Sequence, residues 1–448
     1  MAHNSELIAE EFLQRARSAG ADEADAIVAG GNSVELEVRN GKLEHVERSE
    51  GAEAGLRVFI GDRQACVSGS DFSNESIVIM AEQAVAMARA APEDPFSGLA
   101  DANQLAADTD SCSLDLSDPA DPPDLENIRD IACRAEAAAL AVHGVTQTES
   151  AAAGHGSTTV CVAATNGFLA HRHQTSMFIN CTAISGSGLE MEVDYCFESR
   201  VYASDLPAAE DIGKIAGARA ASRAGPTRPP TGAFPVLYDE RVASSLVGHL
   251  LSAINGTAIT RGASWLLDAQ GQQVLPEKIT LSENPHLPRH QSSKLFDAEG
   301  LPTAQRELVK NGILQGWILD LATARKLDLM STGNASRGTN SPPSPSVTNI
   351  CLPDGENSRE ELISAMNTGL IITSMIGSTI NPTTGDYSRG ASGFWVEQGE
   401  VRGAVSEFTV AGNLKHMLMS VIAANDSKPF RRFRVPSLLV EGLTVAGA

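Results

Sequence analysis

The chain has 448 residues, of which 42% are hydrophobic and only 4% aromatic, and its formal net charge at pH 7 is −22. This length is enough for two or three domains with cores of their own. The excess of acidic side chains argues against nucleic-acid binding, which normally relies on a basic patch.

The cysteines and the absence of long apolar segments predict where the protein works. The seven cysteines are odd in number and no two are spaced C-x-x-C, which is typical of reduced thiols rather than of a disulfide framework or a zinc ribbon. The chain opens without a basic segment followed by an apolar run, and no stretch of about 18 apolar residues occurs. We therefore expect no membrane association and a cytoplasmic protein.

The first 110 residues (1–110) predict an N-terminal α+β domain of helices and antiparallel hairpins. Apolar spacing predicts a helix over 5–19 and another over 74–91. Between them, alternating segments flank Asn40-Gly41, which predicts a hairpin because both central residues of such a turn need positive φ. A second hairpin is expected around Gly61-Asp62.

A second α+β domain is expected over 115–225. It follows a stretch rich in Pro and Asp, 92–124, which lacks periodicity and is interpreted as a linker. An Ala-rich helix over 124–143, several alternating strands and a closing helix over 208–224 make up this middle domain.

The remaining residues, 231–448, predict a C-terminal domain of mostly antiparallel sheet with a few helices. It begins with a strand over 233–239, and further hairpins are expected around Asn311-Gly312 and Gln398-Gly399. A segment rich in Ser, Gly, Pro and Asn over 331–347 predicts a mobile loop. The fold class expected for the whole chain is α+β.

Common catalytic motifs are absent from the sequence. There is no GxxxxGK[ST] phosphate loop, no GxSxG nucleophile elbow and no GxGxxG after a strand, which argues against most ATPases, α/β-hydrolases and Rossmann enzymes. The single basic cluster, Arg431-Arg432-Phe433-Arg434, is interpreted as a solvated segment rather than as a site for an anionic partner.

Two pairs of histidines could hold a metal ion. His171 and His173 lie two apart in a predicted strand and so share a face, although a solvated face is the preferred interpretation. His286 and His290 lie four apart, but the prolines around them argue against a regular helix face.

His249, in the predicted helix SSLVGHLLSAING, is the most distinctive histidine. Its neighbours four residues away on the same helix face are Ser245 and Ala253, and neither is a usual zinc ligand. Because a zinc site needs three or four N, S or O donors, the pattern favours a packed or hydrogen-bonded histidine.

Several blocks of the sequence resemble the TldD/TldE family, also called PmbA and once described as modulators of DNA gyrase. The resemblance extends over nearly the whole chain, and its last blocks are closest to the TldE/PmbA branch. The blocks are ERSEGAEAGLRVFIGDRQACVS, ATNGFLAHRHQTS, VLYDERVASSLVGHLLSAINGTAI, TGDYSRGASGFWVEQGEV and EFTVAGNLKHML.

This resemblance implies one half of a heteromeric cytoplasmic zinc protease that cleaves unfolded peptides. In that family the TldD-like subunit carries an HExxxH helix and a C-terminal cysteine ligand. The first zinc histidine falls on Ser244, the catalytic glutamate on Ser245 and the second histidine on His249, while 430–437 has no cysteine. The resemblance therefore implies a non-catalytic subunit without metal or cofactor, which binds a TldD-like partner and peptides and could also form homodimers.

Two other functions remain open from the residues. An autonomous hydrolase could use Ser244, Ser245, His249, Asp386 and Arg389, and a Ser245–His249 pair has suitable helical spacing, but no orienting acid or oxyanion motif is evident. A regulator acting directly on DNA gyrase is the third hypothesis, and the acidic charge argues against it.

The block GDYSRGASGFWVE offers candidate contact residues. Asp386, Tyr387 and Arg389 could line a cleft that meets a peptide or a partner, or could pair with one another structurally. Trp395 could belong to the same surface or to the core. A peptide held here by strand addition would be recognised through its backbone.

Overall fold

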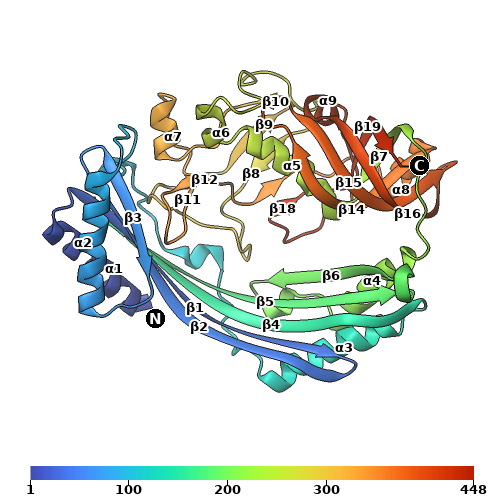
Figure 1. Ribbon diagram of the computed structural model, residues 1–448, viewed down its shortest axis with the longest axis horizontal. Coiled ribbons are helices and arrows are strands. Elements are labelled where there is room, and N and C mark those ends of the chain that lie inside the picture. The colour runs from blue at the N-terminus through green and yellow to red at the C-terminus, as the bar shows by residue number, and fades with distance from the viewer. Residues whose placement is uncertain (1, 448) are drawn as a thin grey trace.

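The computed structural model of the protein describes residues 2–447 and has two layers, a long curved sheet and a C-terminal domain that faces it (Figure 1). Helices and antiparallel sheets occur in both layers. The predicted α+β fold class is therefore confirmed.

The curved sheet has six strands in the order β3-β2-β1-β4-β5-β6, and all neighbours are antiparallel. Its strands are β1 (Glu23–Arg39), β2 (Lys42–Ile60), β3 (Arg63–Gly69), β4 (Val145–Ala164), β5 (Leu169–Ser185) and β6 (Glu192–Arg200). Because β1 pairs with β4 from Asp25 to Val38, the predicted domains 1–110 and 115–225 share one sheet. This pairing joins the two predicted domains through one continuous sheet and leaves no unpaired edge between them.

Four helices cover one face of this sheet in two pairs. The pairs are α1 (Ala2–Ala19) with α2 (Asn74–Ala90), and α3 (Leu125–Leu140) with α4 (Ala209–Ser222). Small side chains let them approach closely: a Cβ at Gly213 of α4 would lie 2.0 Å from the carbonyl oxygen of Ala135 in α3. An alanine-rich core of this kind explains how the domain is filled with few aromatic residues.

The predicted hairpins are confirmed by their backbone angles. Asn40 and Gly41 have φ of 53° and 69°, and the carboxylate of Glu136 accepts both of their N–H groups at 2.7 Å. Positive φ also occurs at Asn311 and Gln398, in the turns predicted for the C-terminal domain. Turn residues therefore determined these connections locally.

The C-terminal domain contains two larger sheets and one small hairpin. One sheet has the order β16-β15-β14-β7-β19-β17, and an additional pairing of β16 with β19 closes it on itself. Most pairs are antiparallel, but β14 with β7 and β13 with β18 are parallel. The strands of this closed sheet are β7 (Gly232–Tyr238), β14 (Gly369–Ile380), β15 (Asp386–Glu397), β16 (Glu400–Asn413), β17 (Ile422–Ala423) and β19 (Leu438–Ala446).

The other elements of this domain surround the closed sheet. The second sheet contains β8 (Leu281–Glu283), β9 (Arg306–Lys310), β10 (Ile313–Leu314), β13 (Ile350–Cys351) and β18 (Phe433–Arg434), and the small hairpin is β11 (Ala335–Ser336) with β12 (Ser344–Pro345). The helices are α5 (Glu240–Ala253), α6 (Gly256–Thr260), α7 (Leu321–Lys326), α8 (Arg359–Met366) and α9 (Leu414–Met419). None of the helices within residues 2–447 is long and apolar enough to cross a membrane.

The segment 331–347, predicted to be a mobile loop, makes specific contacts with both layers. Asn334 donates to the buried carboxylate of Glu283 at 3.0 Å, and Arg337 pairs with Asp25 of the curved sheet. Thr339 lies so close to β2 that a Cβ at Gly55 would be 1.9 Å from its carbonyl oxygen. These contacts hold the segment against the sheet.

Candidate functional site

Helix α5 begins directly after strand β7 and carries Ser244, Ser245 and His249. The side chain of Asp239 caps its N-terminus by accepting the N–H of Arg241. Leu246, Val247 and Leu250 are buried on the inner face of the helix. This packing makes α5 a structural helix of the domain core, and it places His249 beside β14 and β15.

The side chain of His249 is partly buried and lies among aromatic and thioether groups. Its ring meets the ring of Tyr387 edge-on at 6.0 Å, and the Tyr387 hydroxyl lies 3.5 Å from that of Tyr238 and 3.3 Å from the sulfur of Met375. The Nε2 atom of His249 is buried without a hydrogen-bond partner in the described chain. Burial, helped by the positive charge of Arg389, lowers the pKa of His249 to about 4, so the ring is neutral at pH 7.

The serine residues beside His249 do not form a nucleophile–base pair with it. The hydroxyl of Ser245 donates to the carbonyl oxygen of Val242 at 2.7 Å, one turn back along the same helix. An activated serine needs its hydroxyl on the base instead. The contact required for the autonomous hydrolase hypothesis is thus not made.

The donors at α5 do not fit a zinc ion. Ser244 and Ser245 stand where the resemblance places a histidine ligand and the glutamate base, which leaves one imidazole. Within residues 2–447, no group of three or more His, Cys, Asp or Glu side chains lies close enough to hold a metal. Zinc needs three or four such donors, and the described residues around α5 do not supply that number.

The other histidines considered from the sequence have separate partners. His171 Nδ1 lies 3.0 Å from a carboxylate oxygen of Glu6, and His173 Nδ1 lies 2.9 Å from the hydroxyl of Thr159. His286 Nε2 meets the hydroxyl of Thr303 at 3.0 Å. His290 Nδ1 lies 2.8 Å from the Pro288 carbonyl oxygen. The structure uses these rings for hydrogen bonds and ion pairs with nearby residues.

The candidate contact residues of β15 do not form one surface. Asp386 is exposed and accepts from Thr384 and Asn413, whose hydrogen bonds lower its pKa. Arg389 donates to the Gly377 carbonyl oxygen at 2.8 Å. Trp395 packs edge-to-face on Phe234 at 5.2 Å and belongs to the hydrophobic core, and the buried Tyr387 faces His249.

The arginines of the basic cluster near the C-terminus have partners within the chain. Arg431 pairs with Glu198 of β6 at 2.7 Å, and Arg434 pairs with Asp354 at 3.3 Å. Arg432 donates to the Val347 carbonyl oxygen at 2.6 Å. Arg432 and Arg434 are exposed, as expected of a solvated segment, but their pairing with distant segments leaves no local signal in the sequence.

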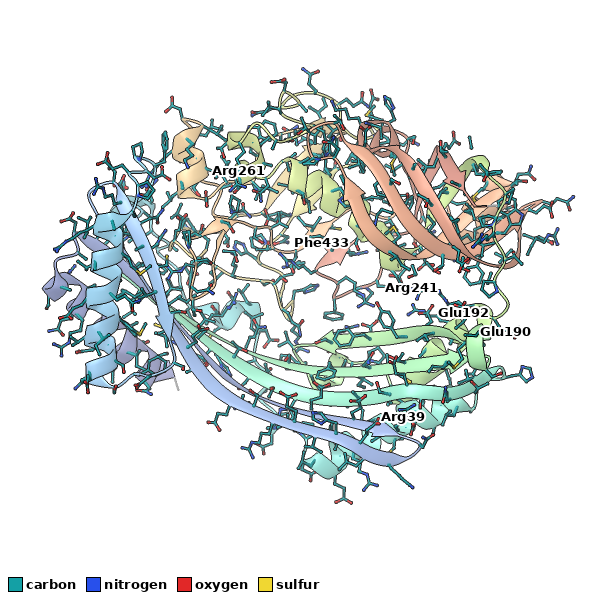
Figure 2. The ribbon with its side chains drawn as sticks, in the orientation of Figure 1. Arg39, Glu190, Glu192, Arg241, Arg261 and Phe433 are labelled. Atoms are coloured by element: carbon teal, nitrogen blue, oxygen red, sulfur yellow. The ribbon has the colours of Figure 1, made fainter. Side chains whose placement is uncertain are left out.

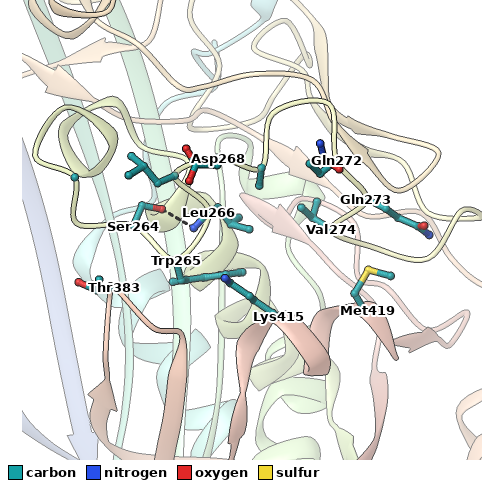
Figure 3. Close-up of a pocket in the computed structure, with 13 residues that line it drawn as sticks. Ser264, Trp265, Leu266, Asp268, Gln272, Gln273, Val274, Thr383, Lys415 and Met419 are labelled. Atoms are coloured by element: carbon teal, nitrogen blue, oxygen red, sulfur yellow. Dashed lines mark hydrogen bonds between the residues drawn. The ribbon is translucent and has the colours of Figure 1, made fainter.

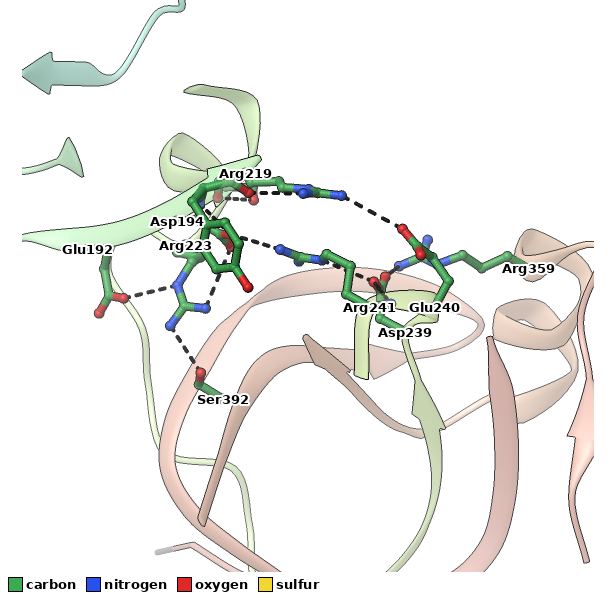
Figure 4. A network of polar contacts seen from close by, with 11 residues as sticks. Glu192, Asp194, Arg219, Arg223, Asp239, Glu240, Arg241, Arg359 and Ser392 are labelled. Atoms are coloured by element: carbon green, nitrogen blue, oxygen red, sulfur yellow. Dashed lines mark hydrogen bonds and ion pairs between the residues drawn. The ribbon is translucent and has the colours of Figure 1, made fainter. Parts of the chain in front are cut away.

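A network of ion pairs at the start of α5 joins the C-terminal domain to the curved sheet (Figures 2 and 4). Arg241 bridges Asp194 of β6 at 2.8 Å and Asp239 at 3.2 Å. Arg223, the C-cap residue of α4, donates to Glu192 at 3.2 Å and to Ser392 of β15 at 3.0 Å. Sequence reasoning missed these residues because the partners are up to 169 positions apart.

The C-terminal end of α5 lies next to an open cavity of about 480 Å³ (Figure 3). Trp265, Val274 and Met419 supply apolar walls, and Asp268 and Lys415 are its charged residues. The hydroxyl of Ser264 ties this wall to α5 by donating to the Ala253 carbonyl oxygen at 2.6 Å. Its lining contains no histidine, cysteine or pair of carboxylates, so it does not have the donor set of a zinc site.

Comparisons with known proteins agree along the whole chain. Three family models match, described as PmbA/TldA metallopeptidase domain 1 over residues 24–88, central domain over 118–224 and C-terminal domain over 231–447. The Escherichia coli O157:H7 protein named Metalloprotease PmbA is 34% identical over 432 residues, which cover 96% of this chain and 93% of that protein. A Haemophilus influenzae protein named Metalloprotease PmbA homolog is 32% identical, with 97% and 94% covered.

Solved structures show the same fold at lower identity. A Bacteroides thetaiotaomicron protein described as a modulator of DNA gyrase superposes with a TM-score of 0.90 at 23% identity, covering 99% of this chain and 98% of that one. TldE from Thermococcus kodakarensis gives a TM-score of 0.82 at 20% identity, covering 98% and 99%.

The fold and the site together define a metallopeptidase architecture whose motif helix lacks a metal-binding set of donors. The chain belongs to the PmbA/TldD metallopeptidase family.

Proposed function

We propose that this chain is the non-catalytic subunit of a cytoplasmic two-chain metallopeptidase, in which a TldD-like partner holds the zinc and performs the cleavage. The observation that carries the proposal is the state of α5. In a chain that matches its family over the full length, the motif helix keeps its packing but presents Ser244, Ser245 and a neutral His249. In this proposal α5 has a structural role in the C-terminal domain, and the zinc-dependent cleavage takes place in the partner.

Unfolded peptides are the substrate class that we propose for the assembly. Strand β6 exposes Val193, Tyr195 and Phe197 by 45%, 57% and 42%, whereas Cys196, between the last two, is buried in the core formed with α3 and α4. The exposed side chains alternate with the core position, so they lie on the face opposite those helices. An exposed row of apolar groups is a suitable contact for an extended peptide or for the partner chain.

The test is co-expression with the homologue from the same genome that carries HExxxH, followed by purification through a tag on this chain alone. We expect the two chains to co-purify, with zinc and peptidase activity on unfolded peptides present in the pair and absent from this chain alone. The control is the same pair with the HExxxH glutamate of the partner replaced by glutamine, which should assemble and be inactive. Failure to co-purify, or EDTA-resistant peptidase activity of the isolated chain, would refute the proposal.

A further inference from the structure

A small cavity lies between the curved sheet and the C-terminal domain and contains two cations that form no salt bridge within the described part of the chain. Its volume is about 220 Å³, and Ile27, Val160, Val162 and Phe296 supply apolar walls. Arg172 of β5 and Lys294 of the C-terminal domain both line it and are largely buried. Two like charges from different layers therefore converge on one apolar space.

The hydrogen bonding of these two cations is incomplete. Arg172 Nη1 has one long contact, 3.5 Å to the Ser293 carbonyl oxygen, and Lys294 Nζ donates to the Ala335 carbonyl oxygen at 3.1 Å. Neither has a carboxylate oxygen within 4 Å in the described part of the chain, although a guanidinium can donate five hydrogen bonds and an ammonium three.

The nearby acids are already engaged. Asp297 lines the cavity, but its oxygens accept backbone N–H groups of Glu299, Leu301 and Ala335 at 2.9–3.0 Å. A third cation of the lining, Arg337, is paired with Asp25. The lining thus has two positive charges without a hydrogen-bonded acid. Its carboxylate, Asp297, is hydrogen-bonded to the backbone and attracts Lys294 without a direct contact.

Burial is unfavourable for both cations. Burial lowers the pKa of Arg172, and burial together with the repulsion of Arg172 lowers that of Lys294. An anion held between them would restore hydrogen bonds and neutralise one charge, and charge-assisted hydrogen bonds of this kind are among the strongest in proteins.

We propose that this cavity binds a carboxylate attached to an apolar group, namely the C-terminal residue of a peptide. Its volume is below the roughly 300–1,000 Å³ of sites for drug-sized ligands, which suits one or two residues. The cations take the carboxylate and the walls around Phe296 take the side chain. The identification of the carboxylate with a peptide end rests on the proposed function, whereas the anion site itself does not.

The binding test uses the full-length chain without its partner, so its outcome is independent of co-purification. Calorimetric titration with N-acetyl-alanyl-leucine is expected to show binding, and its C-terminal amide should bind at least tenfold more weakly. R172Q and K294Q should each weaken the acid at least tenfold, whereas K278Q, which removes an exposed lysine paired with Glu356, should not. Equal binding of acid and amide, or no binding of either, would overturn the proposal.

Two further measurements ask whether the bound carboxylate belongs to a peptide or to a simple fatty acid, and whether Lys294 is needed to bind it. If free 4-methylpentanoate binds as tightly as the acetylated dipeptide, the peptide assignment is wrong. The dipeptide should raise the Tm of the unsubstituted protein, and K294M should abolish this rise. A K294M variant that keeps the full ligand-induced rise would contradict the proposal.

Discussion

The ring of His249 packs edge-on against the ring of Tyr387, with 6.0 Å between the centroids and 68° between the planes. The pair occupies the position at which the family resemblance places a zinc ligand. An aromatic neighbour stabilises a neutral, packed imidazole, and this is the state that burial imposes on His249.

The first prediction concerns the pH dependence of stability through His249. Its pKa is about 4 in the folded protein and near 6.5 when unfolded, so between these values the unfolded state binds more protons. The contribution is complete above pH 6.5 and is lost as the pH falls toward 4, with a loss on the order of 1–2 kcal/mol after allowance for solvent screening. Urea unfolding of H249F and unsubstituted protein at pH 7.5 and pH 5 should show a smaller loss in the variant.

The same variant distinguishes packing from metal binding. Because Nε2 of His249 has no hydrogen-bond partner in the described chain, H249F should unfold within about 1 kcal/mol of the unsubstituted protein at pH 7.5. A loss well beyond this range, or a metal-dependent Tm of the unsubstituted chain, would contradict a packed, metal-free histidine.

The second prediction concerns the buried acid Asp25. Its carboxylate is shared by Arg57 and Arg337, and all three side chains are nearly inaccessible, with 2–4% exposed. D25A would leave two buried guanidinium groups unpaired, so we expect it to destabilise the protein by about 3–5 kcal/mol. E407A, which breaks the exposed pair with Arg228, is the control and should cost less than about 1 kcal/mol. If D25A and E407A lowered the free energy of unfolding by similar amounts, the buried cluster would stabilise the protein no more than an exposed ion pair does.

The third prediction concerns the contact between β2 and the segment 331–347. A Cβ at Gly55 would lie 1.9 Å from the Thr339 carbonyl oxygen, so G55A should displace the segment and increase hydrogen exchange over 331–347. G51A is the matched control on the same strand, because no atom lies within 4 Å of its added Cβ. Unchanged exchange in G55A would mean that the segment is not held by this approach.

The fourth prediction concerns the junction between the two layers. R241A removes the bridge from Asp194 to Asp239 and leaves a buried acid, Asp194, with fewer partners. We expect faster limited proteolysis of the connection at 226–231 and a lower Tm. R402A removes an exposed pair with Glu400 and should leave both unchanged. If R241A and R402A behave alike, the network does not fasten the domains.

Local features of the fold could be predicted from the sequence. Asn40-Gly41 determines its turn because only a few residue types adopt positive φ. The absence of zinc donors at Ser244 and Ser245 also follows from residue identity alone. The sequence could therefore predict that this helix does not supply a set of zinc ligands.

Contacts between distant segments could not be predicted in this way. The sequence shows that β1 and β4 are strands but not that they pair, and it gives no sign that Arg337 reaches Asp25, 312 positions away. The ion pairs and hydrogen bonds of the run at Arg431 could not be seen in the sequence, because its acceptors come from other segments of the chain. Pairing and burial depend on which groups face each other after folding, and sequence spacing does not encode this.

By itself, the sequence indicated the hairpin turns, many of the helices and strands, and the absence of zinc donors at Ser244 and Ser245, because backbone preference and donor chemistry belong to individual residues. Only the tertiary structure decided that the two N-terminal segments form one sheet, that His249 packs neutral against Tyr387, and that Arg172 and Lys294 meet in one cavity. The physical reason is that burial and long-range charge pairing arise between segments that are adjacent only in the folded chain.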